Sequence, residues 1–331
     1  MKKWDFTLGV DVSKLTLDIH CKELNIHIQI ANGSQGFKVF QSWCKEFKIG
    51  LRSSFVVLEY TGGYEYKFLQ FCESKRILYT RIAGLAIKRS LGIVRGKNDK
   101  VDARRIAQYG SEKSHDLKPA GPVNPTIMAL RQYLSFRKRL VRESAGYKAT
   151  LTERKVMYPA KADDMLTRMM AKKIKENDQL VKKLEAQLEI MIEADPAILM
   201  NYKIIRSIKG IGNINALMTI AYTENFTCFK SARSYAVYAG VVPFDHSSGT
   251  SISGRRKVSN LANKELKQEL NQAARVAIKW NQDLKLYAER KLQEKPYKVV
   301  LNNVKFKLIL IMFSLVNRGE LYVDNYQKVA C

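Results

Sequence analysis

Apolar and polar positions along the first third of the chain follow the periods of strands and helices in turn. Residues 6–12 and 55–58 are continuous apolar runs typical of buried strands, whereas residues 26–30 alternate as a half-exposed strand does. We predict strands at 6–12, 15–19, 26–30, 55–58 and 77–82, and helical spacing at 37–43, 64–75 and 84–94. Three antiparallel strands, followed by strands that alternate with helices, predict a mixed sheet with helices packed on it.

The remaining two thirds of the chain are predicted to be mainly helical. Prolines and glycines at 119–125 mark a linker, and a helix rich in basic residues follows from residue 126 to 155. Apolar residues near heptad positions come next, at Met170, Ile174, Val181, Leu184, Leu188 and Met191. About three heptads are short for an independent coiled coil, so a helical hairpin that packs on itself is an equal alternative.

These patterns predict an α/β plus α fold with three domains. Residues 1–115 are predicted to form a mixed sheet of the ribonuclease H kind, which would carry the catalytic groups. Residues 116–200 are predicted as a basic helical or coiled-coil linker. Residues 201–331 are predicted as a mostly helical domain that includes a helix-hairpin-helix-like element at 207–213.

The net charge of the chain indicates which kinds of molecule it binds. There are 57 Lys+Arg against 31 Asp+Glu, a formal net charge of +26, which favours a polyphosphate or an anionic membrane as partner. The hydrophobic content of 46% is that of a globular protein and not of a disordered basic tail. The apolar run 308–316 is too short to cross a bilayer, so no membrane partner is expected.

The location of the protein is predicted from its N-terminus and its cysteines. No signal peptide is expected, because the first residues lead directly into a strand. The five cysteines form no Cys-x-x-Cys pair and are interpreted as reduced thiols. We therefore expect a cytoplasmic, nucleoid-associated protein of the bacterial type.

Four acidic residues are the candidate chemistry. Asp11 and Glu59 each end an apolar strand, where a carboxylate is costly to bury without a cation. Asp99 and Asp102 open a helix three residues apart, which puts both on one face; the alternative is that they only cap that helix. Four converging carboxylates would repel one another unless Mg²⁺ or Mn²⁺, which prefer oxygen ligands, bound between them.

Two glycine-containing segments are candidates for phosphate binding. The segment 92–98 has the glycines and lysine of a nucleotide loop but is one residue short and lacks Ser or Thr after the lysine, so no ATP is expected. At Lys209, Gly210 and Gly212, a turn between two helices could bring backbone amides to a phosphate, and a plain turn between core helices is the alternative.

Further phosphate contacts are expected from side chains. The basic helix supplies Arg131, Arg137, Lys138, Arg139 and Arg142. A cluster at Arg255, Arg256 and Lys257 follows a polar loop rich in serine and glycine. These contacts would give affinity for a phosphate backbone and not sequence choice.

Three blocks of this sequence resemble the signature blocks of one family. They are 9–14 (Gly-Val-Asp-Val-Ser-Lys), 59–64 (Glu-Tyr-Thr-Gly-Gly-Tyr) and 97–104 (Lys-Asn-Asp-Lys-Val-Asp-Ala-Arg). They are similar to those of the DEDD-type insertion-sequence transposases related to the Piv DNA invertase, the "IS one-ten" family. The glycine turn and the segments 238–243 and 247–251 resemble the family's C-terminal half, so the resemblance covers nearly the whole chain.

The resemblance implies a RuvC-like N-terminal domain whose acidic tetrad is Asp11, Glu59, Asp99 and Asp102. It also implies a nucleophilic serine in the C-terminal domain, for which Ser248 is the first choice, with Ser247 and Ser251 as rivals. The expected partners are DNA (element ends and target), a structured bridge RNA that guides the reaction, and further copies of the chain in a dimer or tetramer.

This sequence departs from the family at two places. Residues 259–262 are Ser-Asn-Leu-Ala where the family has Ser-Lys-x-Gly, which puts a phosphate contact or a helix start in doubt, although the basic cluster at 255–257 could compensate. Lys209 stands where proline is common, which a turn tolerates.

The function predicted from the sequence is a transposase or site-specific recombinase that cuts and rejoins DNA with Mg²⁺ through a serine–phosphate intermediate. A structure-selective nuclease of the Holliday-junction type, with water as nucleophile, is the alternative enzyme. A non-catalytic protein that binds nucleic acid, with carboxylates that merely cap helices, is the third hypothesis.

Overall fold

The computed structural model describes most of the chain as two compact units. It covers residues 4–82, 84, 87, 99–158, 164–242, 247–248, 252–253 and 262–324, with the backbone alone for 247–248 and 252–253. The two units are Met1–Val123 and Asn124–Cys331. Each unit is described below by itself.

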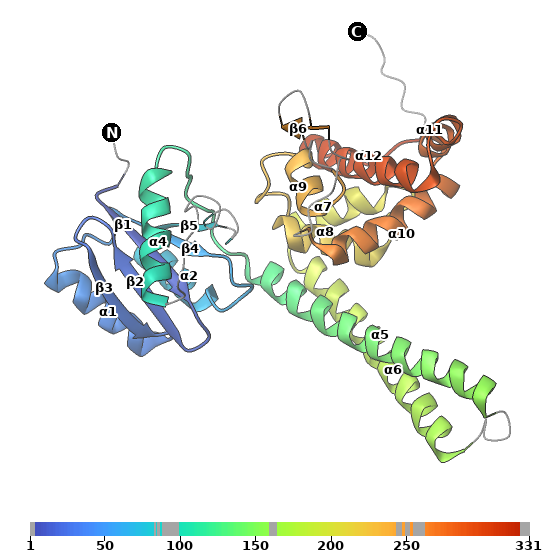
Figure 1. The fold of residues 1–331 in the computed structure, drawn as a ribbon, viewed down its shortest axis with the longest axis horizontal. Coiled ribbons are helices and arrows are strands. Elements are labelled where there is room, and N and C mark those ends of the chain that lie inside the picture. The colour runs from blue at the N-terminus through green and yellow to red at the C-terminus, as the bar shows by residue number, and fades with distance from the viewer. Residues whose placement is uncertain are drawn as a thin grey trace, which may run out of the picture. The chain divides into compact units, whose positions relative to one another are not determined.

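The first unit is built on a mixed five-stranded sheet (Figure 1) with the spatial order β3-β2-β1-β4-β5. Its first three strands pair antiparallel, and β1, β4 and β5 pair parallel. The strands are β1 (Phe6–Val12), β2 (Thr16–Cys21), β3 (Ile26–Ala31), β4 (Ser54–Glu59) and β5 (Leu78–Ile82). The predicted mixed sheet is confirmed, and the predicted strand ends lie within two residues of the observed ones.

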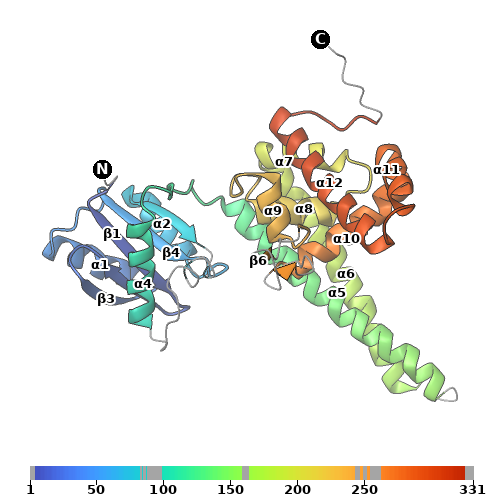
Figure 2. The ribbon, with the colours of Figure 1, turned by 45° about the horizontal axis from the view of Figure 1, so that its top comes forward.

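Helices cover both faces of this sheet, as Figures 1 and 2 show. Helices α1 (Ser34–Glu46) and α2 (Tyr66–Lys75) pack on one face, where Leu8, Val10 and Phe68 belong to the same buried cluster. Helix α4 (Asp99–Glu112) packs on the other face against β1, β2 and β4. Because side chains alternate along a strand, Asp11 lies on the α4 face when Val10 lies on the α1 face.

The proline-rich segment after α4 is held against the sheet of the first unit. The amide of Ala120 donates to the carbonyl of Tyr79 at 2.8 Å, and the amide of Val123 donates to Glu73 Oε1 at 2.8 Å. The hydroxyl of Tyr79 donates to the same Glu73 oxygen at 2.6 Å. Hydrogen bonds therefore order the predicted linker up to residue 123.

The second unit begins with a pair of long helices, α5 (Pro125–Met157) and α6 (Met165–Glu193). They run antiparallel along each other (Figure 1), and Arg137 Nε donates to Glu185 Oε1 across them at 2.7 Å. Leu188, one of the predicted heptad positions, is buried in the core of the unit. The pair is a helical hairpin, which is one of the two alternatives that the heptad pattern left open.

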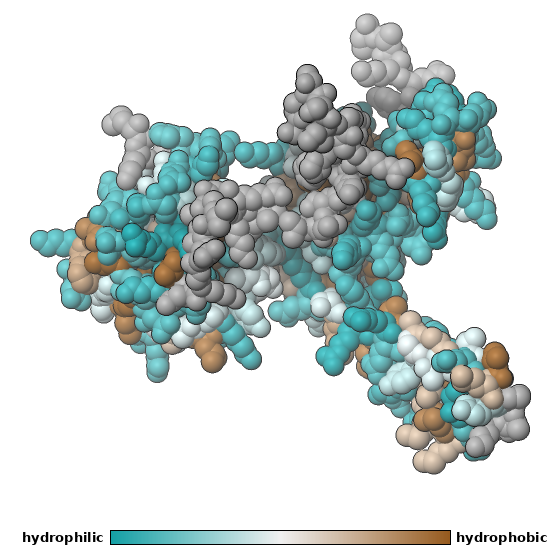
Figure 3. Space-filling view, in the orientation of Figure 1, coloured by the Kyte–Doolittle hydropathy of each residue, from teal (hydrophilic) through white to brown (hydrophobic). Residues whose placement is uncertain are grey.

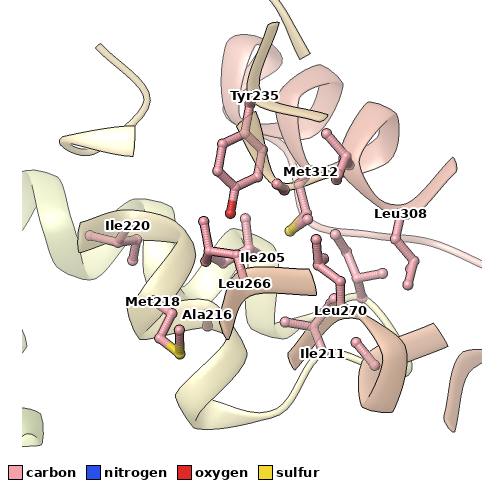
Figure 4. Packing of buried hydrophobic residues seen from close by; sticks show 14 of the residues in the cluster. Ile205, Ile211, Ala216, Met218, Ile220, Tyr235, Leu266, Leu270, Leu308 and Met312 are labelled. Carbon is pink, nitrogen blue, oxygen red and sulfur yellow. The ribbon is translucent and has the colours of Figure 1, made fainter. Parts of the chain in front are cut away.

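The rest of the second unit is a cluster of helices around one apolar core. Its elements are α7 (Pro196–Arg206), α8 (Asn213–Thr223), α9 (Ala232–Tyr238), β6 (Ser247–Ser248), β7 (Ile252–Ser253), α10 (Lys264–Trp280), α11 (Gln282–Leu292) and α12 (Tyr297–Arg318). Figure 4 shows how Tyr235, Leu266, Leu270, Leu308 and Met312 meet in this core. The predicted helical character of this region is confirmed.

Two helices of this unit begin with the same local signal. Asn124 before Pro125 and Asp195 before Pro196 each accept backbone amides of the first helical turn with their side-chain oxygens. Proline is favoured at the first helical position, because it lacks the amide that would go unpaired there. Asn124 Nδ2 also donates to Asp195 Oδ2 at 3.0 Å, which ties the starts of α5 and α7 together.

Helix α12 is the one helix in the described part of the chain that is long and apolar enough to cross a membrane. Half of its most apolar window is buried inside the unit, as expected for a core helix, and a core helix satisfies the same criteria of length and composition. Val304, Leu308 and Ile309 of this helix are fully buried in the apolar core.

Candidate functional site

The first part of the candidate site lies where β1 and β4 end side by side. The two strands are parallel, with Val10 opposite Leu58, so Asp11 and Glu59 follow at the same edge of the sheet. A Cβ atom on Gly84 would come within 1.7 Å of Glu59 Oε1, so the Glu59 carboxylate lies directly against the backbone at that glycine. The two strand-end carboxylates are therefore neighbours.

Helix α4 brings the other two acidic residues to this edge. A Cβ atom on Gly9 would lie 2.3 Å from the carbonyl oxygen of Ala103 and 2.2 Å from the amide nitrogen of Ala107. The backbones of β1 and α4 are thus in direct contact, which only glycine allows here. Asp99 and Asp102 occupy the first turn of α4, where the helix dipole favours negative charge.

The electrostatics of Asp11 show that these carboxylates act on one another. Burial, together with the negative charges of Asp99, Asp102, Glu59 and Asp18, raises the pKa of Asp11 to about 6. Glu59, Asp99 and Asp102 thus lie near enough to Asp11 for their charges to act on it, and we call these four residues the acidic cluster. One cation is also at its edge, because Arg105 Nη1 pairs with Asp102 Oδ1 at 2.8 Å.

The sequence analysis missed a fifth carboxylate beside this cluster. Asp18 of β2 lies directly opposite Asp11 in the antiparallel pair, and it is buried. Its two oxygens bond to β3, Oδ1 with His27 Nε2 at 2.8 Å and Oδ2 with Gln29 Nε2 at 3.0 Å. The signal was the close succession of the two predicted strands, because a hairpin places residues at equal distances from its turn side by side.

The chemistry of this cluster fits a hard divalent cation. Carboxylate oxygens are the ligands that Mg²⁺ and Mn²⁺ prefer, and a cation relieves the repulsion that raises the pKa of Asp11. Among the residues that the structure describes, no three His, Cys, Asp or Glu side chains converge closely enough to hold one ion as they stand. These side chains would have to rearrange to complete a cation site.

Positive charges surround a buried histidine under the same helix. His20 of β2 is 4% exposed, and its Nε2 finds no hydrogen-bond partner among the described residues. Burial and the charges of Arg104, His27, Lys22 and Lys100 lower the pKa of His20 to about 4. The region under α4 therefore contains charged groups of both signs.

The second part of the candidate site is the serine segment of the second unit. Ser247 and Ser248 form the short strand β6, in which Ser247 pairs with Ser253 and Ser248 with Ile252 of β7. Ser251 lies outside the described residues, as does the cluster at 255–257.

The ends of the serine segment are held by helices. Before the segment, the carbonyl of Val241 accepts the side-chain amide of Asn302 at 2.6 Å. After it, the amide of Asn263 donates to the carbonyl of Tyr238 at 2.9 Å, so the chain returns to α9. The residues on either side of the segment are thus held at α12 and α9.

Two transposase families match this chain. Residues 8–154, which include all four carboxylates, match the transposase family DEDD_Tnp_IS110. Residues 202–289, which include the serine segment, match the Transposase IS116/IS110/IS902 family. The chain belongs to the IS110 family of transposases. It is therefore a DNA transposase or recombinase, and the recognition made from the three sequence blocks is confirmed.

Two relatives of this transposase extend over nearly its whole length, and a third covers about half of it. The pilin gene-inverting proteins of Moraxella lacunata and Moraxella bovis are each 23% identical over 323 residues, which cover 95% of this chain and 96% of theirs. The insertion element IS110 uncharacterized 43.6 kDa protein of Streptomyces coelicolor is 25% identical over 174 residues, 52% of this chain and 42% of that protein.

The glycine turn of the transposase combines a packing role with an open helix end. Gly210 has φ +111, and a Cβ atom there would lie 2.6 Å from Ala277 Cβ, so this glycine lets α10 approach. Gly212 caps α8 and would have nothing within 4 Å of a Cβ atom. Lys209 pairs with Asp324. The amides at Gly212 are thus the accessible part of this turn.

The basic residues of α5 divide into two groups. Arg131 donates to the carbonyl of Ala221 at 2.9 Å and pairs with Glu224, Arg137 pairs with Glu185, and Lys138 pairs with Glu265 at 2.7 Å. Arg139 and Arg142 are exposed on the same helix. Carboxylates within the unit already offset part of the charge of the first group.

Proposed function

We propose that this transposase cuts and rejoins DNA by using Asp11, Glu59, Asp99 and Asp102 to hold divalent cations and Ser248 as the nucleophile. The observation that carries the proposal is the raised pKa of Asp11, because its causes include the charges of the other three tetrad residues. Carboxylates that only capped helices would have no reason to gather around one strand end.

The proposed chemistry assigns a separate task to each part. Bound Mg²⁺ or Mn²⁺ would supply a Lewis acid for the phosphate under attack. The four carboxylates would position that cation, and Asp18, anchored by His27 and Gln29, would add negative charge opposite Asp11. Attack by Ser248 on phosphorus would form a phosphoserine ester and release a 3′-hydroxyl, which can later rejoin without ATP.

Several positively charged or amide groups support the proposed binding of DNA. Arg139 and Arg142 are the residues of α5 best placed to meet phosphates, because Arg131, Arg137 and Lys138 already have carboxylate or carbonyl partners. The open amides at Gly212 add an anion site at a helix N-terminus. Arg255, Arg256 and Lys257 remain proposed contacts beside the serine.

A guide RNA and a second copy of the chain complete the proposed assembly. The net charge of +26 is large enough for DNA and a structured RNA together. The far end of the hairpin exposes Val156 (80%) and Met165 (76%), and Figure 3 shows apolar surface there. Apolar side chains at such an end favour a contact between copies, as a dimer or tetramer. We place the transposase in the cytoplasm, where its DNA lies.

The carboxylates are tested with Asp11→Asn. With a supercoiled plasmid that carries the DNA flanking the gene, this change is expected to lower Mg²⁺-dependent cleavage by about 100-fold or more while DNA binding stays intact. Exposed Asp116→Asn serves as the control and keeps full activity. Unchanged cleavage and unchanged cation binding by the Asp11 variant would favour a protein that only binds nucleic acid.

The serine is tested by trapping the covalent intermediate on a denaturing gel. Ser248→Ala is expected to abolish the protein–DNA adduct, whereas Ser247→Ala and Ser251→Ala keep it. If strand joining survives unchanged in Ser248→Ala and in both control variants, the covalent mechanism is wrong and a nuclease that uses water is favoured. Sequencing the RNA that co-purifies with the transposase tests the guide: one abundant structured RNA is expected.

A further inference from the structure

A buried lysine of the second unit has no acidic partner in the described part of the chain. Lys305 of α12 is 3% exposed, and no described residue forms an ion pair or hydrogen bond with it. Lysine is among the residues least often buried to this degree. Its Nζ is not among the buried polar atoms of the described residues that lack a hydrogen-bond partner, so the ammonium group reaches the surface while the methylene groups are buried.

The position of Lys305 connects it with the serine segment. It lies one helical turn after Asn302, whose side chain holds Val241 just before that segment. Lys267 of α10 lies one turn after Asn263, whose amide holds the chain just after it. The two lysines therefore come from the two helices that hold the ends of the segment containing Ser248, and α10 packs against α12.

The charges around Lys305 are positive. Burial and the charge of Lys267 lower the pKa of Lys305 to about 8. The two acidic residues of α10 have other charged neighbours: Glu265 pairs with Lys138 of α5 at 2.7 Å, and the charges of Arg137 and Glu265 act on Glu269. Neither lysine forms an ion pair with a carboxylate among the described residues, so an anion would stabilise the two positive charges.

We propose that Lys305 and Lys267 form a phosphate-binding site for the DNA strand at the base of the serine segment. The site rests on the proposed function in one respect, namely that Ser248 acts on the same strand. Phosphate is the anion that fits, because the partner of a transposase is DNA, and two ammonium groups bind phosphate oxygens as point charges. A purely structural lysine would only fill space with its methylene groups.

Inorganic phosphate is the probe that distinguishes a phosphate-binding lysine from a purely structural one. In wild type, raising phosphate at constant ionic strength, with chloride as the replaced anion, is expected to raise the unfolding temperature, because a ligand of the folded state stabilises it. Lys305→Met has similar volume and no charge. We expect it to unfold at the same or a higher temperature without phosphate, and to bind phosphate at least about tenfold more weakly.

The matched control is Lys264→Met, an exposed lysine at the start of α10. It is expected to respond to phosphate as wild type does, which accounts for general effects of the anion on a basic protein. Lys267→Met, less buried than Lys305, provides a second variant with the same expected loss. If both Lys305→Met and Lys267→Met respond like the control, the site does not exist.

A second measurement joins this site to the reaction. In plasmid cleavage, Lys305→Met is expected to raise KM about tenfold or more, whereas Lys264→Met leaves KM unchanged. Phosphate binding does not depend on Asp11 or Ser248, so Asp11→Asn and Ser248→Ala keep the phosphate response of wild type. Failure of the proposed chemistry would therefore be recognised separately from failure of this site.

Discussion

Single side chains on the α4 face of the sheet have their ionisation set by burial and by their neighbours. Asp11 and His20 lie on neighbouring strands under the same helix, and both groups are driven toward their neutral forms. For Asp11 the cause is negative charge and burial, and for His20 it is positive charge and burial. The charges that act on the two residues thus differ in sign, although both residues lie under α4.

The first prediction concerns His20 and acid. Because the folded protein lowers the pKa of His20 from 6.5 to about 4, the unfolded chain takes up the proton first as pH falls between these values. The free energy of unfolding should therefore fall below pH 6.5, by about 2 kcal/mol from this residue. In His20→Gln this part of the loss should disappear when thermal unfolding is followed from pH 7 to 4.

Exposed His115→Gln is the control for this measurement, and it should lose stability with acid as wild type does. Equal acid sensitivity of His20→Gln and wild type would show that the imidazole is solvated and not buried under α4.

At the scale of elements, the direct contact between β1 and α4 is the feature on which the acidic cluster depends. We predict that Gly9→Ala lowers the free energy of unfolding by about 3 kcal/mol or more, because its methyl group would overlap the backbone of α4 at Ala103 and Ala107. Since the helix must shift, Asp99 and Asp102 move away from Asp11, and Mg²⁺-dependent cleavage should fall as well. Denaturant unfolding and plasmid cleavage provide the two measurements.

Gly146→Ala is the matched control, because a Cβ atom there would meet nothing within 4 Å inside the helix α5. That change should stabilise the protein by about 0.5–1 kcal/mol, as alanine does in a helix. A Gly9→Ala protein that is as stable as wild type would contradict the observed packing.

The sheet could be predicted from the sequence because its information is local. Each strand shows its own two-residue period or apolar run. The identity of the approaching helix could not be predicted, because nothing near Gly9 in the sequence specifies Ala103 and Ala107. Asp18 was missed for the same reason: its role depends on the register with Asp11.

The basic helix illustrates a similar limit. The five basic residues named on this helix predict a phosphate-binding face, yet Arg137 pairs with Glu185 and Lys138 pairs with Glu265. These partners are 48 and 127 residues away in the sequence. Charge content was predictable from local sequence, and its distribution among partners required the packing of α5 against α6 and α10.

At the scale of the whole molecule, a net charge of +26 makes affinity for nucleic acid depend on salt. We predict that the double change Arg139→Gln with Arg142→Gln lowers the slope of log affinity against log salt concentration by about 2, because both guanidinium groups are exposed and available to phosphates. Fluorescence anisotropy with a labelled DNA duplex in EDTA measures this slope without cleavage.

The ion-paired residues Arg137 and Lys138 provide the comparison with the exposed pair Arg139 and Arg142. Replacing Arg137 and Lys138 by Gln removes the same formal charge, and it should change the slope by less than the exposed pair does, because these two side chains contact Glu185 and Glu265 and not phosphates. Equal slopes for the two double variants would mean that formal charge, and not exposure, governs binding.

The connection between the two units is very short. The amide of Val123 is held by Glu73 in the first unit, and the next side chain, Asn124, is held by Asp195 in the second. Between these two anchors there is only one peptide group. This connection can rotate about the few bonds that flank the peptide group. It cannot lengthen unless Glu73 or Asp195 releases its hydrogen bond.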